Sequence, residues 1–364
     1  MIGAGVRRIG LGIFSRPVIW AIASSVADSK TQQSVRPTAA KRRSLAARIA
    51  LAFGSALLTI AVLELLFRSI MPASTHHLMY QESTDPALGV ELVPGADFEF
   101  TGVTIPIPPT RVVISNQGLR DVEIVRPKPA GRRRLLCLGD STTFGWGVEM
   151  EEGFCYRLNG LLGRQWNTVN LGVPGYNTSQ EVRRLETVGL SFEPDVVMVL
   201  FDGNDYQPPL DYGGADSWTT WLTDRSALVQ WIRKRLRGGG GTPEDEAHHD
   251  AGIAAADGGP ARGPSEGPAW DGKAAVLNAF TQLIKMSQTQ GFRLLVLMPN
   301  SDEDQELRRL LDRYTVPYQS MRDALMGPPN DVLIPEDNHP NAEGHARIAR
   351  LAARILRERN IIAY

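Results

Sequence analysis

The chain has 364 residues, of which 43% are hydrophobic and 22% are charged, which is typical of a globular protein with one large or two modest domains. Its formal net charge is −1, so no excess of Lys and Arg is present to neutralise phosphates, and nucleic acid is excluded as the main partner. The two cysteines, Cys137 and Cys155, are too few for a disulfide framework. We expect Cys137 to be a small core residue, with a Cys137–Cys155 bridge as the alternative.

The N-terminal part of the chain contains one long apolar stretch. Residues 45–67 carry charge only at Arg48 and Glu64, near the two ends, and Lys41-Arg42-Arg43 stands shortly before them. Because about 20 apolar residues span a bilayer, this stretch predicts a transmembrane signal-anchor helix. The basic residues on its N-terminal side predict that residues 1–44, expected to be unstructured, stay in the cytoplasm, and that the rest lies in the periplasm or outside the cell. A cleaved signal peptide and a buried helix are the alternatives.

Residues 72–130 are rich in Pro and β-branched residues and predict a small β-rich extension. Apolar and polar residues alternate in Phe98–Thr101 and in Arg111–Ile114, which is the pattern of half-buried strands. The turn sequence Asn116-Gln117-Gly118 is expected to close the extension.

From residue 131 to the C-terminus, short apolar runs alternate with stretches in which apolar residues recur at helical spacing. The expected strands are Leu135–Leu138, Thr168–Leu171, Asp195–Phe201 and Phe292–Met298. The expected helices are Glu152–Leu162, Ser179–Leu190, Lys273–Gln290 and Asn341–Arg359. This alternation predicts an α/β domain over 131–364, in which helices cover both faces of a central parallel sheet. In such sheets the ligand lies at the carboxyl ends of the strands.

An insertion at 208–270 interrupts this pattern. Residues 238–268 are dominated by Gly, Pro, Ala and acidic residues and are expected to be disordered. Before them, an apolar stripe leads into Arg233-Lys234-Arg235. The stripe consists of Trp218, Trp221, Leu222, Leu228, Trp231 and Ile232. It predicts either an ordinary helix packed on the core with a solvated basic end, or an amphipathic helix that lies on a membrane or covers an acyl pocket.

Three polar turns directly follow expected strands: Gly139-Asp140-Ser141, Gly172 to Gly175, and Gly203-Asn204. Because the carboxyl ends of parallel strands meet at one edge of a sheet, we expect these turns to lie close together. A serine is a weak nucleophile until a base takes its proton and a third group orients that base. Ser141 is therefore the candidate nucleophile, and the glycine N–H groups and the Asn204 amide are candidate donors to an oxyanion.

His339 is the candidate base among the six histidines. The other five lie beside the apolar segment, in the insertion, or within a helix rich in Arg and Glu: His76, His77, His248, His249 and His345. Asp337 is the candidate acid, provided that the backbone turns sharply between the two residues, and Glu336 is its rival.

No metal or other cofactor is expected. The segment Gly267–Ala274 nearly fits a phosphate-binding loop, but it lacks the final Ser or Thr and does not follow a strand. The segment His248-His249-Asp250 is expected to be solvated rather than to bind a metal ion. The chain contains no Gly-x-Ser-x-Gly elbow, which argues against the α/β-hydrolase class.

Together these motifs resemble the SGNH (GDSL-type) hydrolase family over residues 130–364. The four blocks of that family are matched by Gly139-Asp140-Ser141, Asn170–Gly175, Gly203-Asn204-Asp205 and Asp337-Asn338-His339-Pro340. The segment Asn116–Asp121 resembles one that often precedes this domain in bacterial envelope members of the family.

The resemblance implies a flavodoxin-like three-layer α/β/α fold. It also implies Ser141 as nucleophile, His339 as base, and an oxyanion hole made by the N–H groups of Ser141 and Gly175 and the side chain of Asn204. Two positions depart from the family pattern. Asp202 stands where the third block usually has Gly, and the acid often lies three residues before the histidine, at Glu336 here. Asp337 matches the two-residue spacing of other members and is preferred.

The residues and the resemblance predict a membrane-anchored serine esterase that acts on carboxylic esters. Acetyl groups on an envelope polysaccharide or exopolysaccharide are the first expected substrate, and lipids are the second. Acyl transfer to a polysaccharide and a non-catalytic envelope-binding module are the alternatives. The sequence points to no particular protein partner.

Overall fold

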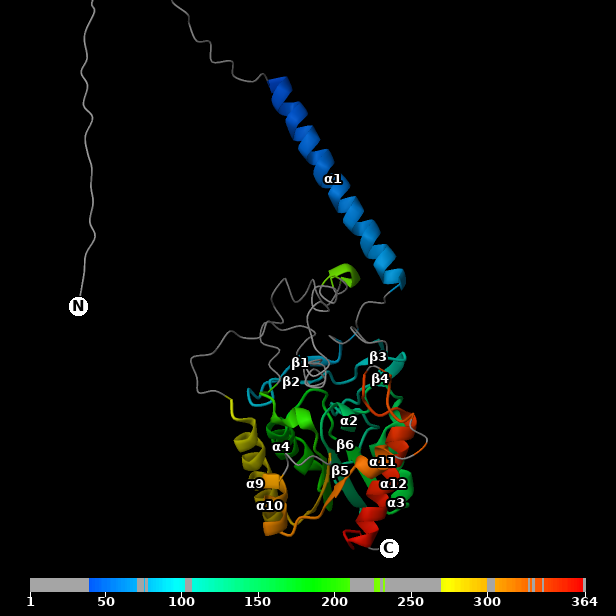
Figure 1. The fold of residues 1–364 in the computed structure, drawn as a ribbon, viewed down its shortest axis with the longest axis vertical. Helices are drawn as coiled ribbons and strands as arrows, with labels where there is room; N and C mark the ends of the chain where they lie inside the picture. The colour runs from blue at the N-terminus through cyan, green and yellow to red at the C-terminus, as the bar shows by residue number, and fades with distance from the viewer. Residues whose placement is uncertain are drawn as a thin grey trace, which may run out of the picture. The chain divides into compact units, whose positions relative to one another are not determined.

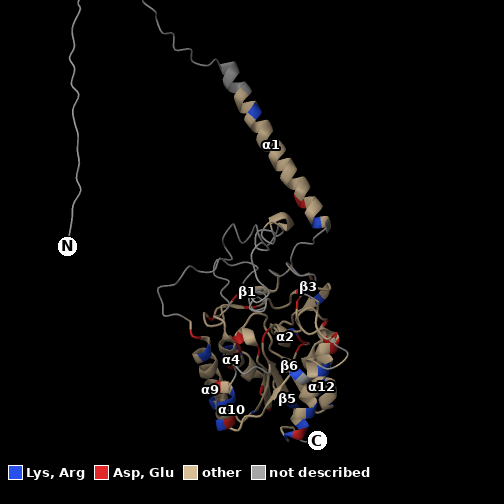
Figure 2. Ribbon diagram, viewed as in Figure 1, with Lys and Arg blue, Asp and Glu red and all other residues tan. Residues whose placement is uncertain are grey.

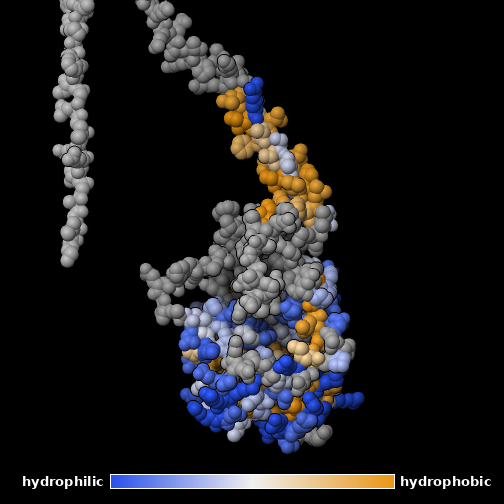
Figure 3. Space-filling view, viewed as in Figure 1, coloured by the Kyte–Doolittle hydropathy of each residue, from blue (hydrophilic) through white to orange (hydrophobic). Residues whose placement is uncertain are grey.

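The computed structural model describes residues 39–70, 75, 78–101, 107–209, 226–229, 232, 270–299, 305–326, 328, 331–335 and 337–362. Helix α1 (Ala39–Ile70) contains the expected apolar stretch. Its apolar window within Leu45–Ser69 has a mean hydropathy of 2.3 and is 0% buried, and Figures 2 and 3 show apolar residues along α1 with charges only towards its ends. In the described part of the chain, α1 is the one helix long and apolar enough to cross a membrane.

The centre of the fold is a five-stranded parallel sheet with the strand order β6-β5-β7-β8-β9 (Figure 1). Its strands are β5 (Arg133–Leu138), β6 (Trp166–Asn170), β7 (Val196–Leu200), β8 (Arg293–Met298) and β9 (Tyr318–Ser320). The first four confirm the strands expected from the sequence. Strand β9 was not expected, because its three residues are polar or aromatic and only half-buried.

Helices cover both faces of the sheet, which confirms the predicted three-layer α/β fold. One layer contains α4 (Thr178–Thr187), α9 (Gly272–Gln290) and α10 (Gln305–Arg313), and the other contains α3 (Phe154–Leu162), α11 (Arg322–Leu325) and α12 (Ala342–Glu358) (Figure 1). Alternate strand residues point into different layers: Leu136 of β5 packs with the first set of helices and Leu135 with the second. Because successive residues point to opposite faces and both faces are covered, β5, β7 and β8 contain continuous apolar runs.

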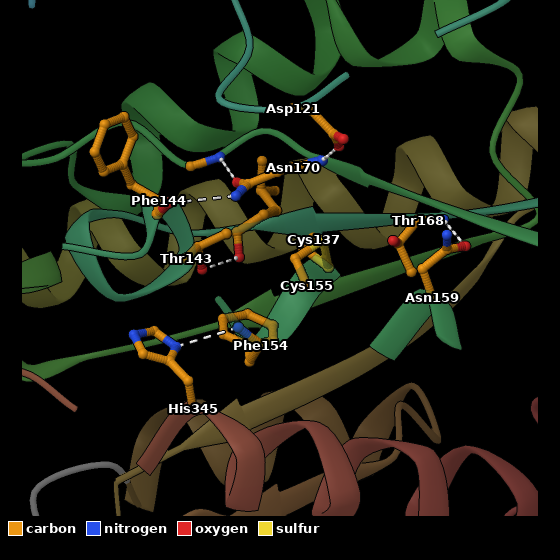
Figure 4. The surroundings of a disulfide bond; sticks show 12 residues. Asp121, Cys137, Thr143, Phe144, Phe154, Cys155, Asn159, Thr168, Asn170 and His345 are labelled. Atoms are coloured by element: carbon orange, nitrogen blue, oxygen red, sulfur yellow. Dashed lines mark hydrogen bonds between the residues drawn. A yellow bond between two sulfur atoms is a disulfide. The ribbon is translucent and has the colours of Figure 1, made fainter. Parts of the chain in front are cut away.

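Cys137 of β5 and Cys155 of α3 are joined by a disulfide, with their Cα atoms 6.2 Å apart. Both residues are buried in the core between the sheet and the second helix layer (Figure 4). The expectation for Cys137 was right about burial, but the structure contains the bridge that was the alternative.

The β-rich segment before the sheet forms two antiparallel pairs. Strand β1 (Tyr80–Glu82) pairs with β2 (Val90–Leu92), and β3 (Asp97–Phe100) pairs with β4 (Thr110–Val113). The last two coincide with the expected strands, and the expected turn is present, since Gly118 has φ +72° and donates its N–H to the Ser115 carbonyl at 3.0 Å. The buried face of these strands shares a hydrophobic core with residues beside the polar turns of the sheet: Phe144, Trp146, Val173, Tyr176 and Ile334.

The expected disorder at 238–268 lies outside the described residues. Of the Trp-rich stripe before it, only Leu228 and Ile232 are described.

Candidate active site

The turn after β5 places Ser141 at the start of a one-turn helix, α2 (Ser141–Phe144). Asp140 caps this helix, because its side chain accepts the N–H of Thr142 at 3.2 Å. The helix ends at Gly145, whose φ of +91° lies in the left-handed region and whose N–H returns to the Ser141 carbonyl. Ser141 is therefore held at the carboxyl edge of the sheet by hydrogen bonds at both ends of a single turn.

The structure brings Ser141, His339 and Asp337 into one hydrogen-bonded chain. Ser141 Oγ lies 2.8 Å from His339 Nε2, and His339 Nδ1 lies 2.6 Å from Asp337 Oδ1. The sharp turn that the short spacing requires is present: Asn338, between the acid and the histidine, has φ +65°. Asn tolerates this left-handed conformation better than most residues. Glu336, the rival acid, lies outside the described residues.

Trp146 completes the surroundings of the acid. Its indole N–H donates to Asp337 Oδ2 at 3.3 Å, and its ring centroid lies 5.8 Å from that of His339. Sequence reasoning missed this residue, because 191 positions separate it from its partner.

The charge around His339 favours a protonated ring. Burial alone would lower the pKa of His339, but the hydrogen bond and charge of Asp337, with Asp140 and Asp202, raise it above its ordinary value. An imidazole in this setting is a stronger base than in water. The geometry therefore allows Ser141 to lose its proton to His339 while Asp337 stabilises the resulting imidazolium.

Asn204 lies beside Ser141 on the short helix η4 (Gly203–Tyr206), which follows β7. Its Nδ2 atom donates to Asp140 Oδ2 at 2.5 Å, and Ser141 Oγ lies 3.3 Å from the same oxygen. An amide nitrogen carries two hydrogens, so Asp140 takes one of them and orients the other. The sequence predicted the two turns but not this contact between them.

Gly175, the other expected oxyanion donor, adopts φ +80°, a conformation that favours glycine. The carbonyl of Pro174, in the same peptide group, accepts a hydrogen bond from the Tyr80 hydroxyl at 3.1 Å. Because a trans peptide is planar, its C=O and N–H point in opposite directions. Tyr80 therefore fixes the direction in which the Gly175 N–H points.

Asn170 links the turn after β6 to helix α2. Its side chain accepts the N–H of Gly172 at 2.9 Å and donates to the Phe144 carbonyl at 3.4 Å (Figure 4). The two turns are also in close contact, since a Cβ atom added to Gly172 would lie 2.3 Å from the Phe144 nitrogen. Gly172 is therefore needed for packing rather than for a special backbone angle.

Two buried carboxyl groups lie near Asp140 and Asp202. Glu181 of α4 and Asp205 of η4 are 1% and 2% exposed, and both oxygens of Glu181 lack a hydrogen-bond partner among the described residues. Burial raises the pKa of both groups well above ordinary values; Asp205, Asp140 and Asp202 add to the effect on Glu181, and Asp140 and Asp202 add to that on Asp205. The charged form is therefore disfavoured in both side chains.

His345 lies in the core and takes no part in this arrangement. Burial lowers its pKa to about 3, and its Nδ1 accepts the N–H of Phe154 at 3.2 Å (Figure 4). In the residues that the structure describes, no cluster of three or more His, Cys, Asp or Glu side chains forms a metal site.

The chain matches the GDSL-like Lipase/Acylhydrolase family over residues 137–347, which is more than half of its length. No curated protein matches it.

Several solved structures are similar to it at low identity. TesA is 14% identical over 63% of this chain and 100% of its own, with a TM-score of 0.40. A lipase/acylhydrolase from Enterococcus faecalis is 14% identical over 62% of this chain and 96% of its own, with a TM-score of 0.36. A two-domain esterase (CEX) active on acetylated mannans is 17% identical over 62% of this chain and 49% of its own, with a TM-score of 0.36.

The family match runs from the end of β5 to the first turns of α12 and includes the polar turns described above. This chain belongs to the GDSL-like lipase/acylhydrolase family of ester-hydrolysing enzymes.

Proposed function

We propose that this protein is a membrane-anchored serine esterase in which Ser141 is the nucleophile, His339 the general base and Asp337 the orienting acid. The observation that carries the proposal is the 2.8 Å contact between Ser141 Oγ and His339 Nε2, with Asp337 on the other ring nitrogen. A serine, a base within reach of it and an acid that orients the base are the parts that nucleophilic catalysis requires.

The reaction follows from these positions. His339 takes the Ser141 proton as the hydroxyl oxygen attacks the ester carbonyl carbon. The carbonyl oxygen becomes an oxyanion, which accepts hydrogen bonds from the Ser141 and Gly175 N–H groups and the free hydrogen of Asn204 Nδ2. His339 then protonates the departing alcohol, leaving an acyl group on Ser141. Water, deprotonated by His339, releases the acid and restores the serine.

Asn204→Ala tests the oxyanion hole. Losing one such donor is expected to lower kcat on the order of 10²–10³-fold while KM changes little, because the donor acts on charge that develops in the transition state. Steady-state hydrolysis of p-nitrophenyl acetate by the full-length protein in detergent measures this. A kcat within threefold of wild type removes Asn204 from the mechanism.

The nucleophile is tested separately with a fluorophosphonate probe on the same full-length protein. We expect modification at Ser141, located by mass spectrometry, and its loss in both Ser141→Ala and His339→Ala. A folded wild-type protein that resists the probe and does not hydrolyse the ester would contradict the serine-esterase assignment.

We place the catalytic part, residues 131–364 with the extension 72–130, on the outer side of the cytoplasmic membrane, anchored by residues 45–67. Lys41-Arg42-Arg43 on the N-terminal side of α1 supports this orientation. The Cys137–Cys155 disulfide supports it too, since structural disulfides persist in oxidising compartments. Protease added to spheroplasts should then degrade the catalytic part, and full protection would reverse the topology.

Acetyl groups on an envelope polysaccharide or exopolysaccharide are our proposed substrate, because the anchor would hold the site where such polymers are made or modified. Acetate release from acetylated polysaccharide is expected to depend on Ser141. Release of fatty acid from phospholipid without release of acetate would favour a lipid substrate. Appearance of new acetyl groups on an unacetylated glycan supplied with a donor ester would instead assign acyl transfer.

A further inference from the structure

Arg120 is a buried arginine of the segment Asn116–Asp121, which the site described above does not use. Its side chain is 1% exposed, and no carboxylate of the described residues forms an ion pair with it. Burial lowers the pKa of Arg120 to about 10, partly offset by Glu149 and Glu151, so the guanidinium remains charged at neutral pH. Burying a charge without an ion-pair partner costs free energy, and hydrogen bonds must replace those that the group made with water.

Arg120 donates to one backbone carbonyl of β4, that of Arg111 at 3.3 Å, and to three that follow the proposed nucleophile. Its Nη1 donates to the Gly145 carbonyl and, at 3.3 Å, to that of Phe144, while its Nη2 donates to the Val148 carbonyl at 2.6 Å. The guanidinium also lies 4.7 Å above the centre of the Phe144 ring. Carbonyls at the end of a helix have no partner within it and carry partial negative charge, so a cation is favoured there.

The loop that Arg120 holds carries the tryptophan that contacts the acid. Trp146 lies between the bound carbonyls of Gly145 and Val148, and its own N–H donates to the Ser141 carbonyl at 3.0 Å. Its indole N–H reaches Asp337 at 3.3 Å. A planar guanidinium with several donors in a fixed geometry fixes such a loop more closely than a single ammonium can.

We propose that Arg120 is a positioning residue for ester hydrolysis: it fixes loop 144–148 so that Trp146 holds Asp337 against His339. This inference rests on the proposed roles of Ser141, His339 and Asp337. The neighbouring Asp121 also constrains this loop. Its carboxylate accepts the N–H of Asn170, whose side chain donates to the Phe144 carbonyl (Figure 4).

The test compares Arg120→Lys with Arg134→Lys in the full-length protein in detergent. Arg134 is a matched control, because it is also 1% exposed and donates to backbone carbonyls, those of Phe192 and Val125, but stands at the start of β5, away from the nucleophile. Both variants replace a buried guanidinium, which has several N–H donors, with one ammonium group, so both are expected to lose thermal stability. Only Arg120→Lys is expected to lower kcat, by 10- to 100-fold, with KM within threefold of wild type.

Two further readouts separate positioning from a general loss of stability. The acid limb of the kcat/KM profile is expected to move to lower pH in Arg120→Lys, because a displaced Asp337 no longer raises the pKa of His339. Trp146→Phe, which lacks the indole N–H, should move the limb in the same direction. Because both changes act through one contact, the double variant should be little worse than the poorer single variant.

Three results would overturn the inference alone: an acid limb that stays in place in Arg120→Lys, equal loss of activity in Arg134→Lys, or simple additivity with Trp146→Phe. If Arg120→Lys does not fold, Trp146→Phe is used in its place. An acid limb that stays in place in Trp146→Phe would then overturn the inference. Esterase activity that is unchanged in Ser141→Ala would instead overturn the proposed function, and this inference with it.

Discussion

Asp337→Asn is the most informative single change at the site. Two donors converge on the Asp337 carboxylate: His339 Nδ1 contacts Oδ1 at 2.6 Å, and Trp146 Nε1 contacts Oδ2 at 3.3 Å. When His339 accepts the Ser141 proton at Nε2, its Nδ1 carries a hydrogen and donates to the acid. An Asn side chain has one oxygen and one NH2 group, so one of the two buried donors would face another donor.

The charge sets the size of the effect. Asp337 and His339 are 3% and 18% exposed at their side chains, so their interaction is only partly screened. Charges about 4 Å apart at an effective dielectric constant of about 20 attract by about 4 kcal/mol. That energy stabilises the imidazolium formed during attack and corresponds to about 10³-fold in rate. The wrong tautomer adds to it, so we expect kcat to fall by about 10³–10⁴-fold.

Asp337→Asn should also alter the pH dependence of kcat/KM. In the free enzyme His339 must be neutral to act as base, so kcat/KM rises as pH passes through its pKa. Asp337 raises the pKa of His339. Removing that charge therefore shifts the acid limb of kcat/KM to lower pH, while the plateau falls.

The assay is p-nitrophenyl acetate hydrolysis by the full-length protein across pH 4–9, with circular dichroism to confirm folding. Glu336→Gln, the adjacent acid, is measured in parallel and should retain activity within threefold. A folded Asp337→Asn protein with near wild-type kcat, beside a Glu336→Gln protein that has lost 10²-fold or more, would show that Glu336 is the acid and that the 2.6 Å contact is not catalytic.

Three further changes test the surroundings of the site. Gly172→Ala should abolish activity or folding, because its Cβ would lie 2.3 Å from a backbone atom. Gly203→Ala is the control and should fold normally, because no atom lies within 4 Å of the added Cβ. Equal Tm values for the two variants would refute this. Glu181→Gln should raise Tm more at pH 9 than at pH 5. The pKa of Glu181 is raised in the folded protein, so the wild type loses stability as the pH rises, and Gln, which does not ionise, removes that loss. A change in Tm that does not depend on pH would refute this. Tyr80→Phe should lower kcat several-fold with little change in KM, since the Gly175 N–H loses its fixed direction; an unchanged kcat refutes this.

Much of the fold was predictable because its signals are local. Strands β5, β7 and β8 each contain a continuous buried apolar run, which is typical of a strand covered on both faces. By contrast, β9 pairs with β8 through three half-buried residues that are polar or aromatic. This strand depends on a neighbour already in place, so composition and periodicity alone did not identify it.

The candidate site also combines residues with local sequence signals and contacts that have none. Ser141, His339 and Asp337 were predicted from their motifs and from their positions at strand ends and in loops. The contacts that orient them were not, because each joins residues far apart in sequence: Asn204 with Asp140 over 64 positions, and Trp146 with Asp337 over 191. Asn204 itself was predicted from its motif, but its contact with Asp140 was not, and nothing in the local sequence marks Trp146.

The β-rich extension illustrates why a motif match alone describes the site incompletely. The family match begins at residue 137, yet two residues upstream of it bind carbonyls within the site region: Tyr80 binds that of Pro174, and Arg120 binds that of Gly145, at the end of α2. These two residues act on carbonyl oxygens, which any sequence provides, so no residue pattern inside the family region reveals the need for them. The extension also buries its apolar face against Phe144 and Trp146. Helix α2 is a single turn with few internal hydrogen bonds, and in the proposal above the upstream segment adds further constraints to it.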